Sequence, residues 1–127
     1  MYYFAKELQG DFDSVTEKVV AELKKEGFGI LTDIDVRETL KKKLDVDFPR
    51  YRILGACNPP FAYKALQTEE RIGTMLPCNV VVRELESGAI EVVAVDPVAS
   101  MQAVENPDLV EIAKAIRAKL QAVLEKL

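Results

Sequence analysis

Apolar residues at helical spacing mark a helix near the start of the chain. Val15, Val19 and Leu23 recur at intervals of four, so they form one apolar stripe on a helix of residues 15–26. Ser14 precedes this stripe and, with a glutamate three positions later, fits the N-cap of a capping box. The pattern therefore predicts an amphipathic helix that packs on a core.

Three further segments predict helices: residues 36–44, 59–73 and 107–127. The first is short and carries Val36, Leu40 and Leu44 at the same spacing of four. Each of the other two follows an Asn-Pro dipeptide, with Asn58 or Asn106 at the N-cap and proline in the first helical turn. The last segment carries the longest apolar stripe.

Five segments have the composition and alternation of strands: residues 2–8, 28–35, 51–57, 79–85 and 89–95. In the second segment Phe28, Ile30, Thr32 and Ile34 occupy alternate positions, so we expect them to face one side of a sheet. The fourth and fifth segments are joined by Glu86-Ser87-Gly88 and predict a hairpin. Consecutive valines in the fourth segment are typical of a central strand.

The order of these elements predicts a single α+β domain over residues 1–127. We expect two layers: a five-stranded mixed or antiparallel sheet with helices packed mainly on one face. Of the 127 residues, 49% are hydrophobic and 30% are charged, which is typical of a globular protein with its own core.

Charge and composition exclude several classes of function. The net charge is −4 and the chain has no basic stretch of the kind that nucleic acid requires, so we expect no nucleic-acid partner. No apolar run approaches the ~20 residues of a membrane span, and no targeting segment is recognisable, which predicts a cytoplasmic protein with no membrane partner. Histidine is absent, which excludes Ser-His-Asp and Cys-His catalytic arrangements.

The candidate chemistry centres on a Cys-Asn dipeptide that occurs twice, each time beside proline. Cys57-Asn58 and Cys78-Asn79 contain the only two cysteines, and they flank one predicted helix. Cys57 comes just before the helix N-terminus, where the helix dipole favours a thiolate. Cys78 has the phase of the valines that follow it. For both cysteines the alternative to a functional role is packing as a small buried apolar residue.

A disulfide and a metal site are two other possible roles of the cysteines, and the sequence argues against both. A disulfide between Cys57 and Cys78 is possible if their strands are neighbours, but a reducing cytoplasm argues against a permanent one. Two cysteines are too few for a metal site, and we expect no metal. Asn58 is explained by helix capping, whereas Asn79 has no helix to cap. We therefore rank Asn79 and the two sulfurs first as candidate ligand-binding residues, and Asn58 last.

A second candidate site uses arginines. Arg52 and Arg83 lie within predicted strands, where a charge usually marks the exposed face. If both share one groove with Lys64, they would bind an anionic ligand.

The residues around the cysteines also carry a family resemblance. Gly55 to Pro59, Ile72-Gly73, Leu76 to Val82 and Asp96-Pro97 resemble the domain-of-unknown-function family 302 over nearly the whole chain. The resemblance implies a compact α+β domain that assembles as a homodimer. It implies no activity, because the family has no established one.

The sequence thus favours a small cytoplasmic homodimer that binds a small ligand or a partner near Cys57, Cys78 and Asn79. One alternative is a thiol-dependent enzyme or redox protein that uses Cys57 and Cys78. Another is a structural or interaction module without a ligand. The sequence names neither a cofactor nor a catalytic residue.

Overall fold

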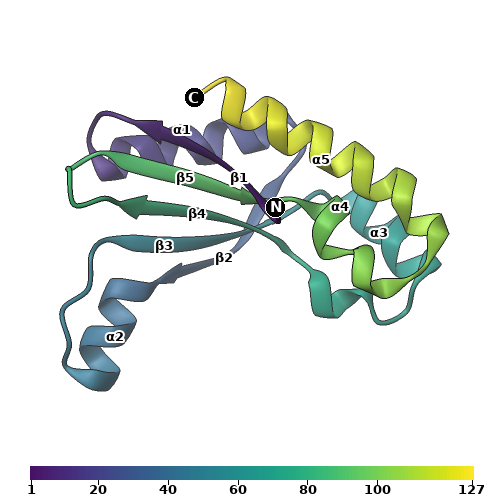
Figure 1. The fold of residues 1–127 in the computed structure, drawn as a ribbon, viewed down its shortest axis with the longest axis horizontal. Coiled ribbons are helices and arrows are strands. Elements are labelled where there is room, and N and C mark those ends of the chain that lie inside the picture. Colours follow the sequence, from purple (N-terminus) through teal and green to yellow (C-terminus); the bar gives the residue numbers. More distant parts are fainter.

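Five strands form one open sheet in the computed structural model, which describes residues 1–127 (Figure 1). The spatial order is β1-β5-β4-β3-β2, and every neighbouring pair is antiparallel. The predicted α+β class is confirmed, and of the two kinds of sheet expected the antiparallel one is found. The strands are β1 (Tyr3–Leu8), β2 (Gly29–Asp35), β3 (Tyr51–Cys57), β4 (Cys78–Glu84) and β5 (Ile90–Val95).

Helices cover one face of this sheet (Figure 1). The α-helices are α1 (Phe12–Lys25), α2 (Val36–Leu44), α3 (Pro59–Thr68), α4 (Pro97–Ser100) and α5 (Val110–Glu125). Short 3-10 turns are η1 (Ile72–Met75), η2 (Gln102–Val104) and η3 (Pro107–Leu109). None of the helices has the length and hydropathy that crossing a membrane requires.

The core lies between the sheet and helices α1 and α5. The predicted stripe of α1 is buried there, with Val19 and Leu23 fully covered. From the sheet, Val80 and Val82 of the central strand β4 are also fully buried. This confirms that the valine run belongs to a central strand, and burying such side chains stabilises the fold by about 1.5–3 kcal/mol each.

Helix α1 begins earlier than predicted. Asp11, not Ser14, is the N-cap: its Oδ2 accepts hydrogen bonds from the Ser14 backbone N–H and the Ser14 hydroxyl, both at 3.0 Å. Aspartate is as good an N-cap as serine. The earlier start also places Phe12 in the core.

Strand β2 does not keep the predicted alternation. A bulge between Ile30 and Thr32 shifts the register, so that Ile30 lies opposite Ala56 while Thr32 lies opposite Gly55. Ile30 therefore shares the core-facing side with Ala56, and Thr32 lies on the other side, because one inserted residue reverses every later position. The prediction that both face one side was wrong.

The predicted helix of residues 59–73 is also too long. Helix α3 ends at Thr68, and Ile72 is buried from the separate turn η1 instead. Ile72 belongs to a small second core cluster with Ala65, Met101 and Leu109. The end of the predicted helix is thus a separate turn that still contributes to the core.

Helix α2 stands apart from the rest of the molecule. Figure 1 shows it beyond the ends of β2 and β3, away from α1 and α5. No α2 residue is buried, and Leu44 is 66% exposed. We call residues 34–48, which contain α2, the α2 arm.

Candidate functional site

A largely apolar pocket lies at the end of the sheet where β3 leads into α3. Its volume is about 260 Å³, and ten of its 13 lining residues are hydrophobic. Both cysteines and Asn58 line it, together with Ala62 and Ala65 of α3. We call it the cysteine pocket.

The two cysteines enter the pocket from neighbouring strands. Cys57 is the last residue of β3 and is half-buried. Cys78 is the first residue of β4, lies opposite Ala56 in the ladder and is only 5% exposed. Its burial follows the phase of the valines after it, as the sequence predicts. Both thiols are free, so the structure contains no cysteine pair.

Burial changes the acidity of Cys78. Desolvation raises the pKa of its thiol from 9.0 to about 11, and Cys57 makes a smaller contribution in the same direction, although the two cysteines are not close. The thiol is therefore neutral at physiological pH, and a neutral thiol is a poor nucleophile and metal ligand. Cys78 therefore contributes a buried, largely apolar surface to the pocket wall.

Asn58 occupies the N-cap position of α3, as predicted, but its side chain does not cap the helix. It makes no side-chain cap hydrogen bond, and Pro60 at the second helical position lacks one of the two N–H groups that such a side chain would bind. Instead its Nδ2 donates to the Glu26 carbonyl oxygen at 3.1 Å, and the side chain is only 8% exposed. Asn58 thus ties the pocket wall to the end of α1.

The hydrogen bond to Glu26 also determines which atom of the Asn58 side-chain amide is available to a ligand. Because Nδ2 is committed to the backbone of Glu26, the other amide atom, Oδ1, is the acceptor that remains, and no protein donor uses it. An unused acceptor on a residue that lines an apolar pocket can orient a ligand.

At the second Asn-Pro dipeptide the side-chain cap forms as predicted, but it caps the 3-10 turn η3, and α5 begins only at Val110. Asn106 Oδ1 accepts a hydrogen bond from the Asp108 backbone N–H at 3.0 Å, which is an N-cap contact. Its Nδ2 donates to the Thr68 carbonyl oxygen at 3.1 Å. Both asparagines thus bond to the end of another helix through Nδ2, but only Asn106 also caps the turn that follows it.

Asn79 lies away from the cysteine pocket. It is exposed, lies opposite Gly55 in the ladder and is flanked by the buried Cys78 and Val80. Strand alternation therefore places it on the other face of the sheet. Of the four candidate residues, the structure brings together Cys57, Asn58 and Cys78, and leaves Asn79 apart.

The predicted groove of Arg52, Arg83 and Lys64 does not form. Arg52 lies opposite the buried Val82, on the helix-covered side, whereas Arg83 lies one residue further along the ladder, on the opposite side. Each is paired: Arg52 with Asp33, and Arg83 with Glu91 at 2.7 Å between Nε and Oε1. The hypothesis fails because adjacent ladder positions point to opposite faces.

No metal centre is evident, since no three His, Cys, Asp or Glu side chains gather where an ion could be held.

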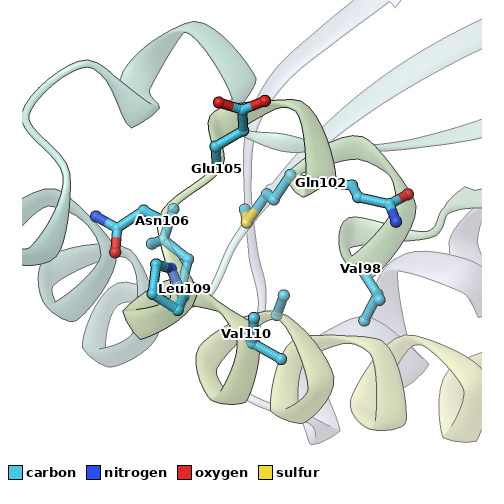
Figure 2. Close-up of a pocket in the computed structure, with 9 residues that line it drawn as sticks. Val98, Gln102, Glu105, Asn106, Leu109 and Val110 are labelled. Atoms are coloured by element: carbon cyan, nitrogen blue, oxygen red, sulfur yellow. The ribbon is translucent and has the colours of Figure 1, made fainter.

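A further pocket of about 420 Å³ lies between α5 and the segment from α4 to η3 (Figure 2). Val98, Leu109 and Val110 line its apolar part, and Gln102 and Glu105 bring polar groups to its edge. The sequence did not predict it, because its lining comes from three short elements, the loop residues between them and the start of α5, which share no common periodicity. The cysteines take no part in it.

Comparison with known proteins places the fold in a family. A model of the family described as "Domain of unknown function DUF302" matches residues 4–127. The chain belongs to the DUF302 family. The resemblance seen in the sequence is thereby confirmed.

A solved structure supports the same conclusion. The DUF302 chain described here is 31% identical to an uncharacterized conserved DUF302 protein from Bacillus stearothermophilus, with a TM-score of 0.92. The match covers 99% of this chain and 98% of that one. No curated protein matches. The comparisons thus define the DUF302 fold and leave the chemistry to be inferred from the pockets.

Proposed function

We propose that this DUF302 domain binds a small ligand with an apolar body in the cysteine pocket, and that it acts as a cytoplasmic homodimer. The observation that carries the proposal is a pocket of about 260 Å³ with ten hydrophobic residues among 13. An engineered apolar cavity of about 150 Å³ is enough to hold benzene. The cysteine pocket is therefore large enough for a ring or a short chain.

The polar groups of the pocket suggest how a ligand is oriented. The Asn58 side chain is held in place by its bond to the Glu26 carbonyl oxygen, which leaves Oδ1 as a fixed acceptor. A ligand with one N–H or O–H group at the end of an apolar body matches this arrangement. Cys57, the more accessible thiol, flanks the same space, and Cys78 adds apolar surface.

Pocket-filling substitutions test ligand binding. Ala62→Leu places a larger side chain in the pocket, while Ala118→Leu makes the same change at an exposed site on α5 and serves as the control. Benzene and indole are the probes, and the thermal midpoint is the measurement. Indole has an N–H for Asn58 and benzene has none, so indole should stabilise the wild-type protein more.

We expect both probes to raise the midpoint of the wild type and of Ala118→Leu, and to leave Ala62→Leu unchanged. Equal shifts in all three proteins would show binding elsewhere and reject the cysteine pocket. No shift of the wild-type midpoint would reject ligand binding. Of the two alternatives, the interaction module would then be favoured over the thiol-dependent enzyme, because Cys78 is buried and its thiol is neutral.

The α2 arm supports the homodimer. The arm carries four of the large apolar side chains that the monomer leaves exposed: Ile34, Leu44, Val46 and Phe48. Exposed apolar side chains concentrated in one segment favour an interaction surface there. A second copy is the simplest partner, because twofold symmetry sets the same patch against itself.

Sedimentation velocity tests the dimer. Leu44→Asp puts a charge into the exposed apolar cluster, and Lys43→Asp changes the neighbouring α2 residue, which has no ion-pair partner, as the control. We expect dimers of the wild type and of Lys43→Asp, and monomers of Leu44→Asp. A wild type that sediments as a monomer at micromolar concentration would overturn this part of the proposal.

A further inference from the structure

A third pocket, at the opposite end of β3 from the cysteines, is rich in arginine. Its volume is about 200 Å³, and it lies where α1, α2 and β3 begin. Three of the six arginines in the chain line it: Arg37, Arg50 and Arg52. We call it the arginine pocket. In a protein with a net charge of −4, this concentration of guanidinium groups calls for an explanation.

Two of the three guanidinium groups retain free donors. Arg37 makes no side-chain hydrogen bond or ion pair in the structure, although it lines the pocket. Arg50 has only a loose ion pair with Asp13, at 3.8 Å, and its guanidinium lies 5.5 Å from the centroid of the Phe12 ring, which limits its movement. Arg52 differs, because two of its nitrogens bind the carboxylate of Asp33.

The carboxylates of the pocket leave room for an anion. Asp35 lines it but is engaged as the N-cap of α2, where it accepts a hydrogen bond from the Glu38 backbone N–H at 2.9 Å. Asp13 is the other lining carboxylate, and its side chain is 70% exposed. With Asp33, which binds Arg52, three carboxylates accompany the three guanidinium groups, but none of them binds Arg37.

We infer that the arginine pocket binds a phosphate or sulfate group, with Arg37 and Arg50 as the main donors. The planar guanidinium group matches the spacing of two oxygens on such an anion and is the side chain best suited to hold it. Arg52 forms part of the pocket wall, and its charge is balanced by the Asp33 carboxylate that it binds. This site is separate from the cysteine pocket and goes beyond the proposed function, so either can fail without the other.

Calorimetric titration at neutral pH and constant ionic strength tests the site. The probes are inorganic phosphate, sulfate and glycerol phosphate, with acetate as a carboxylate comparison. Arg37→Gln and Arg50→Gln should each weaken binding by about tenfold or more, because each removes charge-assisted hydrogen bonds. Arg71→Gln is the control, since Arg71 lies outside the pocket and makes no side-chain ion pair.

A substitution that should strengthen binding distinguishes a loss of the site from a loss of folding. Asp13→Asn removes the loose partner of Arg50, so phosphate should bind more tightly, which an unfolded protein would not do. Tighter binding of glycerol phosphate than of phosphate would indicate a phosphorylated small molecule, and the reverse a free ion. Binding that does not saturate, or that falls equally in Arg71→Gln and Arg37→Gln, would overturn the inference.

Discussion

The two Cys-Asn dipeptides present opposite residues to the solvent. In the first, Cys57 is half-buried and Asn58 is buried; in the second, Cys78 is buried and Asn79 is exposed. The antiparallel ladder explains the second copy, because Cys78 lies opposite the buried Ala56 and the next residue must turn to the other face. The two copies of the dipeptide therefore lie in different environments.

The difference teaches that register and neighbouring prolines decide what each residue does. Asn58 lies after the strand, and Pro60 removes one of the two N–H groups that its side chain could cap; its amide bonds to the end of α1 instead. Asn79 stays in the strand and points outward. Substitutions in the two copies should consequently have very different effects.

The largest contrast should appear in thiol reactivity. In a Cys57→Ala background, Cys78 of the folded protein should react with iodoacetamide at least about 100-fold more slowly than in the unfolded protein, since each unit of raised pKa lowers the thiolate fraction tenfold. The rate of alkylation, followed by mass spectrometry, measures this. Cys57 in a Cys78→Ala background should react in the folded state, because it is not fully buried. Equal alkylation rates of Cys57 and Cys78 in the folded protein would contradict the predicted difference in reactivity.

The same raised pKa predicts a pH dependence of stability. The folded state holds the Cys78 proton up to a pKa of about 11, against 9.0 for an ordinary thiol, so the contribution is complete below pH 9.0 and is lost as pH rises toward about 11. The loss should reach about 3 kcal/mol. Urea unfolding across this range, with Cys78→Ala as reference, measures it. A wild type that tracks the variant throughout would contradict the burial of a titrating thiol.

Asn58→Ala should destabilise the fold by about 2 kcal/mol, because it leaves the Glu26 carbonyl oxygen without its donor in a buried place. Denaturant unfolding measures the loss. Asn106→Ala is the comparison, since it removes both the cap of the turn η3 and the donor to the Thr68 carbonyl oxygen, and it should also cost about 2 kcal/mol. An Asn58→Ala variant as stable as the wild type would mean that the contact with α1 contributes nothing.

The smallest effect belongs to Asn79→Ala. Its side chain is exposed and makes no hydrogen bond with the protein, so the free energy of unfolding should change by less than about 0.5 kcal/mol. Binding of benzene and indole should be unaffected as well. A loss of binding in this variant would return Asn79 to the site and would require the ligand to contact both faces of the sheet.

Periodicity was a sound guide wherever one face of an element is buried. The stripe of α1 and the phase of Cys78 with Val80 were predicted correctly, because burial selects apolar residues at fixed intervals. Sequence alone could not show the bulge after Ile30, since alternation continues past the inserted residue. The order of apolar and polar residues does not reveal a bulge when apolar residues continue to alternate before and after it in the sequence.

The site was less predictable than the fold. Asn58 was ranked last because Asn-Pro suggests a cap, yet the second proline at position 60 is the signal that a cap is unfavourable there. The gathering of Arg37, Arg50 and Arg52 depends on how two helix starts meet β3, which no local pattern contains. Pairing Arg52 with Arg83 failed because the two lie on opposite faces.

The isolation of the α2 arm has a consequence for motion. A helix with no buried residue loses little when it comes away from the sheet, so α2 should unfold locally at a much lower free energy than the core does. Its backbone amides should exchange their hydrogens with solvent well before those of β4. If two arms pack together, that exchange slows as protein concentration rises, and the fastest-opening part of the molecule reports on its assembly.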